Sequence, residues 1–275
     1  MKKKTRSIVI TGNGTNCEVE MAHACRLAGF DHVEIVHISE LIVGEKSLDD
    51  YHFLNLPGGF LDGDDLGAAK AGANRILHAN VMGTDEKLSD QLLRFIGDGK
   101  LVLGVCNGFQ LMVKLGLLPA FDGEYRRQTA TITFNDSARF EDRWTYLTVN
   151  EKSPCVFTRG VSQMYLPVRH GEGKFVTENE AVGVRLRESN QIVMQYSDAA
   201  FNGPVMDYPL NPNGSPDAVA GICDETGRLF GLMPHPEAYL HRTNHPRWTR
   251  EDVPEEGMGL ALFRNAYDYV RAKVL

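Results

Sequence analysis

The residue with the clearest chemical potential in this 275-residue sequence is Cys106, which lies between two glycines in Gly104-Val-Cys-Asn-Gly108. An apolar run, Leu101–Val105, precedes it, and a helical pattern follows it. A nucleophile at such a strand-to-helix turn stands above the sheet, and small neighbours prevent clashes in the strained turn. The helix N-terminus favours a thiolate, and the Asn107 N–H is free to face an oxyanion. The pattern predicts a thiolate nucleophile, although free cysteines are usually small buried residues.

A nucleophilic thiol needs a base that a third group orients, and residues 229–237 end in Met-Pro-His-Pro-Glu. In an extended segment, residues two apart project to the same side, so His235 and Glu237 can form a hydrogen bond. Pro236 fixes the backbone between them, and Pro234 discourages a helix. The segment predicts a base and its orienter. The alternative is a pair of surface residues in a proline-rich turn.

Two other segments offer related chemistry. His170 and Glu172 are also two residues apart, but Gly171 between them leaves the geometry loose, which favours a substrate-binding loop. Cys17 also lies between a strand and a helix. No small residue frames it closely, so it is the weaker candidate for the nucleophile.

A glycine pair ends another predicted strand, in Leu56-Pro-Gly-Gly-Phe60. Such a turn lets a backbone N–H approach a ligand closely, at the same sheet edge as Cys106. Together with the Asn107 N–H, the Gly59 N–H would form a two-donor oxyanion hole. Each donor contributes about 2.7–4 kcal/mol in sites of this kind.

The elements that must position these residues alternate between strand and helix in the first part of the chain. Apolar runs predict buried strands at residues 7–11, 33–38, 51–56 and 101–105. Helical spacing covers Glu18–Ala28, 86–96 and 107–115. The alternation predicts an α/β fold of three layers, with a mostly parallel sheet and helices on both faces.

After Pro119 the pattern changes to strands with alternating polarity, which predicts an antiparallel extension at one edge of the sheet. The predicted strands are residues 129–134, 144–149, 192–196, 218–223 and 229–233. An amphipathic helix at 257–274 closes the chain. No repeat or linker interrupts the pattern, so a single domain over residues 1–275 is expected.

Composition excludes several classes of function. The net charge of -7 disfavours nucleic-acid binding, and Lys2–Lys4 is a solvated end. No signal peptide and no membrane helix are expected. The five cysteines include no CxxC pair, so they indicate neither a disulfide framework nor a zinc knuckle. These features together favour a cytoplasmic location. His235, His241 and His245 lack a cysteine or carboxylate to complete a ligand set, so no metal site is expected. Without a G-x-x-x-x-G-K-[ST] loop, ATP chemistry must lie on another polypeptide.

Seven motifs together resemble the class I glutamine amidotransferases, and within them the branch that serves the phosphoribosylformylglycinamidine synthases of purine biosynthesis. The motifs are Gly14-Thr-Asn-Cys17, Leu56-Pro-Gly-Gly-Phe60 with Gly63-Asp64, Gly104-Val-Cys-Asn-Gly-Phe-Gln110, Gly116-Leu-Leu-Pro119, His170-Gly-Glu-Gly173, Asn211-Pro-Asn-Gly-Ser215 and Met233-Pro-His-Pro-Glu237. They span most of the chain in the family's order.

The resemblance implies a glutaminase in which Cys106 is the nucleophile, His235 the base and Glu237 its orienter. It implies that the glutamine and oxyanion site is shaped by Gly58, Gly59, Phe60, Asn107 and Gln110, with His170, Gly171 and Glu172 lining the pocket. The ammonia would pass to a synthetase subunit that holds ATP and Mg²⁺, with a small accessory subunit as a further partner. No cofactor is expected on this chain.

Two segments depart from the family's pattern. Residues 61–69 lack the usual Ser-Tyr pair and the following Arg, and residues 241–257 are longer and more charged than in the family. Both lie where the resemblance places the synthetase. Two other functions remain alternatives: a cysteine hydrolase of other specificity on the same turn, and a non-catalytic scaffold that regulates a synthetase.

Overall fold

The computed structural model describes residues 4–275, so Lys2 and Lys3 lie outside the described residues. Its main sheet has nine strands in the order β2-β1-β3-β4-β11-β10-β9-β6-β7. The first five are parallel: β2 (His32–His37), β1 (Arg6–Thr11), β3 (Phe53–Leu56), β4 (Leu101–Val105) and β11 (Leu229–Leu232). The rest are antiparallel: β10 (Val219–Cys223), β9 (Ile192–Ser197), β6 (Glu141–Val149) and β7 (Gln163–His170). The predicted parallel sheet with an antiparallel extension is confirmed.

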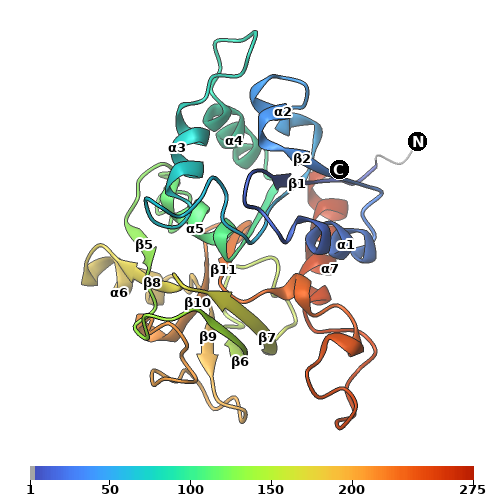
Figure 1. Cartoon of the computed structure of the whole chain (residues 1–275). Helices are drawn as coiled ribbons and strands as arrows, with labels where there is room; N and C mark the ends of the chain where they lie inside the picture. Colours follow the sequence, from blue (N-terminus) through green and yellow to red (C-terminus); the bar gives the residue numbers. More distant parts are fainter. Residues whose placement is uncertain (1–3) are drawn as a thin grey trace.

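Helices cover both faces of the parallel strands (Figure 1). On one face α1 (Glu18–Ala28) packs on α7 (Leu260–Tyr269), and on the other lie α3 (Lys70–His78), α4 (Leu88–Gly97) and α5 (Asn107–Lys114). The remaining helices are α2 (Ile38–Ile42) and α6 (Glu180–Glu188); single turns lie at Leu48–Asp50, Pro216–Ala218, Pro236–Ala238, Arg242–Asn244 and Val270–Val274. As predicted, α1 ends at Gly29, whose φ of 107° is left-handed.

One predicted strand, residues 129–134, lies outside the main sheet. It forms β5 (Ala130–Thr133), which pairs only with β8 (Lys174–Thr177) in a two-stranded sheet. This small sheet packs on α5, where the Phe175 ring stacks on that of Phe109 with 6.2 Å between centroids. The alternation in the sequence predicts a strand here but does not identify its partner, because the partner follows some 40 residues later.

The core is a continuous cluster of buried apolar side chains that extends along the chain from Ile8 to Val270. Within residues 4–275, no helix combines the length and the apolar character that crossing a membrane requires.

Two glycines set the distance between α5 and the sheet. A Cβ at Gly108 would lie 1.8 Å from the Leu56 carbonyl oxygen of β3, and one at Gly104 would lie 2.6 Å from the Gly108 oxygen. Helix and strands are therefore in backbone contact at the point where β4 ends. This contact is the physical reason for small residues on both sides of Cys106.

We predict that Gly108→Ala destabilises the protein by about 1–3 kcal/mol, because the added methyl group overpacks this contact. Gly97→Ala is the matched control: it is also helical, but a Cβ there meets no atom within 4 Å. The control should remain within about 1 kcal/mol of wild type, on the stabilising side. Urea unfolding measures both. Equal stability of the two variants would contradict the close contact.

Candidate active site

Cys106 occupies the turn between β4 and α5 in a strained conformation, with φ 53° and ψ -106°. Such a left-handed conformation costs a non-glycine residue about 1–3 kcal/mol. Two backbone hydrogen bonds hold it: the Cys106 N–H donates to Leu232 O at 2.8 Å, and the Gln110 N–H donates to Cys106 O at 3.0 Å. The thiol lies 3.5 Å from the carbonyl oxygen of Arg169. The sulfur is thus aimed by the backbone, as the sequence predicts.

A cavity of about 370 Å³ opens above Cys106. The predicted residues that line it come from four segments of the chain: Cys106 and Gln110 at the start of α5, His235 after β11, the pair Gly59 and Phe60 after β3, and the loop of His170, Gly171 and Glu172. A volume of this size accommodates a small molecule.

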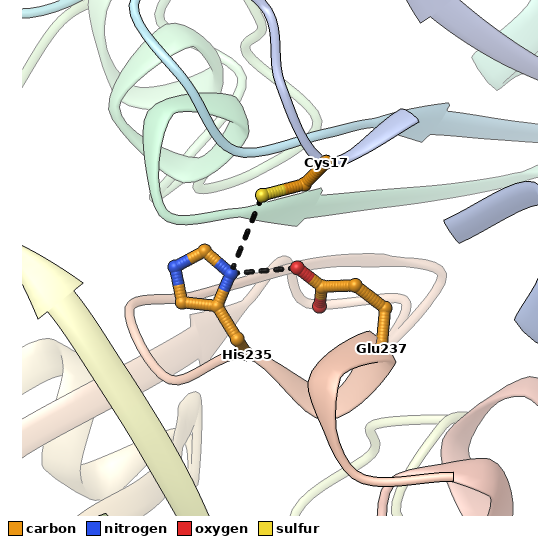
Figure 2. A group of neighbouring side chains, drawn as sticks. All are labelled: Cys17, His235 and Glu237. Carbon is orange, nitrogen blue, oxygen red and sulfur yellow. Dashed lines mark hydrogen bonds and ion pairs between the residues drawn. The ribbon is translucent and has the colours of Figure 1, made fainter. Parts of the chain in front are cut away.

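His235 is buried beside Glu237, and Nδ1 of the ring lies 2.6 Å from Glu237 Oε1 (Figure 2). The predicted contact forms, but not through an extended segment, because the backbone turns into a 3₁₀ helix at Pro236. The His235 N–H donates to Pro167 O of β7 at 2.8 Å. Neither His235 Nε2 nor Glu237 Oε2 has a hydrogen-bond partner among the described residues.

The charge of Glu237 decides the protonation of His235. Burial lowers the pKa of His235, but the Glu237 carboxylate and the Cys106 and Cys17 thiols raise it, and the net direction is well above its ordinary value. The imidazolium form is therefore favoured in the folded protein. This is the protonation state that a neighbouring thiolate requires.

Cys17, the weaker candidate for the nucleophile in the sequence, also belongs to this group. Its Sγ lies 3.9 Å from His235 Nδ1 and donates to Asn16 Oδ1 at 3.1 Å. The residue is the N-cap of α1 and is 9% exposed, and burial raises the pKa of its thiol. The backbone at Cys17 is not strained, so no flanking glycine is needed there. The fold brings Cys17 next to the His235 ring.

Gly58, which was expected to shape the glutamine site, lies elsewhere. It does not line the cavity but lies beneath the base, where a Cβ would be 2.7 Å from His235 Cε1 and 3.2 Å from Cys17 Sγ. The missing side chain leaves room for the imidazole to pack against the backbone after β3.

The two predicted oxyanion donors follow two neighbouring strands, Gly59 after β3 and Asn107 after β4. Gly59 has φ 132°, and its N–H makes no hydrogen bond within residues 4–275. The Asn107 N–H is the first of α5 and has no partner within the helix. The Asn107 side chain does not line the cavity but connects the two segments: Oδ1 accepts from the Leu61 N–H and Nδ2 donates to Gln110 Oε1, both at 3.0 Å.

The loop of residues 170–172 is fixed to the helix and to the segment after β3. Gln110 Nε2 donates to Glu172 O at 2.5 Å, and the Glu172 carboxylate accepts from the Ala68 N–H at 3.2 Å. His170 Nδ1 lies 3.1 Å from Asn135 Oδ1. Burial, with the neighbouring charge of His235, lowers the pKa of His170 to about 3, so this ring is neutral.

Sequence reasoning missed three charged residues of the cavity: Glu20, Asp64 and Arg169. Burial and the nearby Glu172 raise the pKa of Asp64. Asp64 stands in a motif that carries the resemblance, and Arg169 precedes His170, so position in a motif was the available signal. The pattern of charges along the sequence contains no signal for these three residues, because each comes from a different element.

Comparison with known proteins identifies the class. The family of CobB/CobQ-like glutamine amidotransferase domains matches residues 4–270. The chain is therefore a glutamine amidotransferase of this type, which confirms the resemblance seen in the sequence. A glutamine amidotransferase from Thermotoga maritima shares the fold, with a TM-score of 0.55 at 15% identity, over 98% of this chain and 100% of the other.

More similar proteins narrow the class. The phosphoribosylformylglycinamidine synthase subunit PurQ of Dehalococcoides mccartyi is 43% identical over 270 residues, or 98% of each chain. That of Methanococcus maripaludis is 42% identical over 95% of this chain and 97% of its own. A chain in the structure of PurLQS from Thermotoga maritima has a TM-score of 0.70 at 27% identity, covering 98% of this chain and 100% of the other. The chain belongs to the PurQ family.

We predict that Glu237→Gln lowers the pKa of His235, because burial then acts without the opposing carboxylate. An NMR pH titration of the His235 ring measures the shift. Glu20→Gln is the matched control, since Glu20 also lines the cavity but makes no contact with the ring, and it should leave the titration near that of wild type. An unchanged His235 titration in Glu237→Gln would show that the carboxylate does not set the charge of the ring.

Proposed function

We propose that this chain hydrolyses glutamine to glutamate and ammonia through a thioester on Cys106. The observation that carries the proposal is the buried His235, which is hydrogen-bonded to Glu237 and lines the same cavity as the Cys106 thiol. A strained cysteine, a base and an orienting carboxylate are the parts that nucleophilic acyl transfer needs.

In the first half of the reaction, the Cys106 proton already rests on His235 as part of a thiolate–imidazolium pair, and the thiolate attacks the side-chain carbonyl carbon of glutamine. The Gly59 and Asn107 N–H groups stabilise the oxyanion. As the carbon–nitrogen bond breaks, His235 returns the proton to the leaving nitrogen, which departs as ammonia. In the second half, His235 deprotonates a water molecule that attacks the thioester, and the products are glutamate and the Cys106 thiol. Glu237 stabilises the imidazolium in both halves.

The ammonia goes to a synthetase subunit of phosphoribosylformylglycinamidine synthase, with a small accessory subunit in the same complex. The PurQ names of the relatives and the PurLQS assembly of the Thermotoga maritima structure support this part of the proposal. ATP and Mg²⁺ are assigned to the synthetase. The proposal also places the protein in the cytoplasm, and the five cysteines, which are all free thiols, support this location.

Exposed aromatic side chains at the cavity support docking there. Phe134 is 68% exposed, Phe140 56% and Phe60 45%, and all three line the cavity. Aromatic residues exposed together are typical of protein interfaces. A partner that covers them would also close the path of ammonia from bulk water.

We predict that a glutamine-mimicking diazo-ketone labels Cys106 alone and that excess glutamine suppresses the labelling. Cys106→Ala should lower ammonia release by about 10³-fold or more, as for other catalytic nucleophiles. Peptide mass mapping and an ammonia assay, each with the synthetase present, measure these effects. Cys155→Ala, which removes a buried thiol outside the cavity, is the control and should retain labelling. An adduct on Cys17 instead of Cys106 would refute the assignment.

We predict that Phe134→Ser with Phe140→Ser weakens binding of the synthetase at least about tenfold, because exposed aromatic residues dominate such interfaces. Glutamine-dependent synthesis should fall at limiting subunit concentration, whereas synthesis from added ammonium should not change. Met82→Ser is the matched control: Met82 is 64% exposed but lies outside the cavity. Equal binding by the two variants would place the interface elsewhere.

A further inference from the structure

Among residues 4–275, one group of three metal-ligating side chains comes together: Cys17, His235 and Glu237. Figure 2 shows the three pointing toward one another, with Cys17 on one segment and His235 and Glu237 on another. The ligand atoms all lie within 4.8 Å of one another, with Cys17 Sγ 3.9 Å from His235 Nδ1 and that nitrogen 2.6 Å from Glu237 Oε1. The mechanism uses His235 and Glu237 but gives Cys17 no part.

We propose that these three side chains bind a divalent transition-metal ion of the Zn²⁺ class, and that the bound ion inhibits the enzyme. Thiolate, imidazole and carboxylate are the ligands that Zn²⁺ takes in proteins, and sites with three protein ligands keep a fourth position open. Two of the three ligands, Cys17 and His235, line the cavity, so water can reach a fourth position.

The distances are close to those of a tetrahedral site. Zn–S and Zn–N distances of about 2.3 and 2.0 Å place sulfur and nitrogen about 3.5 Å apart, somewhat less than the observed 3.9 Å. Nitrogen and carboxylate oxygen must separate from 2.6 Å to about 3.3 Å. The Glu237 carboxylate can turn to do so, because its Oε2 makes no hydrogen bond to any described residue.

The charges of the site also match a divalent cation. When the ion binds, the Cys17 thiol proton, which now points to Asn16 Oδ1, leaves to solvent together with the His235 Nδ1 proton. The ring keeps its proton on Nε2. A thiolate and a carboxylate then offset the two positive charges, so the buried site is neutral overall. Neutrality matters because all three residues are at least nine-tenths buried, and an uncompensated charge there is costly.

Inhibition follows from the occupied ring, and this consequence rests on the proposed function. A ring whose Nδ1 coordinates the metal and whose Nε2 carries a proton cannot accept the proton of Cys106. This site is not predictable from local sequence, in which only His235, His241 and His245 lie near one another as candidate ligands. The missing thiol comes from 218 residues earlier in the chain.

The test separates binding from catalysis. Zn²⁺ is titrated by calorimetry, and Co²⁺ by its thiolate-to-metal absorption, into Cys106→Ala protein, which needs no activity for the readout. We expect one ion per chain. Adding Cys17→Ala should weaken binding more than about 100-fold, since even an outer-shell partner is worth 10–100-fold. Adding Glu237→Gln should also weaken it, which tests the site without the thiol change. Cys155→Ala is the control and should bind as before.

Two results would overturn the proposal. One is Zn²⁺ binding that survives Cys17→Ala; the other is binding that is lost in Cys106→Ala but kept in Cys17→Ala, which would place the ion on the nucleophile alone. In an ammonia-release assay, the Zn²⁺ concentration for half inhibition should rise more than about 100-fold in Cys17→Ala, relative to that variant's own uninhibited rate. A chain that binds Zn²⁺ as expected but releases no ammonia would refute the proposed function and leave the metal site standing.

Discussion

The site depends on one steric constraint, the backbone contact of α5 with β3 and β4. Because no Cβ fits at Gly104 or Gly108, the chain can change from strand to helix within a single residue. That residue, Cys106, takes a left-handed conformation that cysteine does not favour by itself. Packing of the core therefore holds the strain, and the backbone sets the position of the sulfur, which also contacts the Arg169 carbonyl oxygen. The cost is local, whereas the benefit is a fixed nucleophile.

A fixed sulfur requires a fixed base, and three kinds of interaction hold His235. A backbone hydrogen bond to Pro167 O ties it to β7, the backbone at Gly58 packs under the ring, and Glu237 binds Nδ1. Burial and the carboxylate act in opposite directions on the charge of the ring. The carboxylate prevails, so the site combines a closely packed environment with a protonated imidazole.

The features that sequence predicted are those with local signals. The strand Leu101–Val105, the helix α1, the turn at Cys106 and the pair of His235 and Glu237 each depend on residues within about ten positions. The strand β7 was missed because Pro167 reads as a strand breaker. It is tolerated because β7 is an edge strand: the Pro167 carbonyl points away from β6, so its missing N–H also points away and removes no ladder bond.

Contacts between distant segments could not be predicted from the sequence, and the contact of Cys17 with His235 is the clearest case. Its turn predicts nothing about His235, and only the meeting of α1 with the turn after β11 brings the two together. The consequence is a site with two thiols and one base. On the Nε2 side the ring is free to serve Cys106, and on the Nδ1 side it faces Cys17 and Glu237. The proton on Nδ1 keeps these two functions apart: while it is held by Glu237 the ring acts as a base, and once it leaves the same nitrogen becomes a ligand.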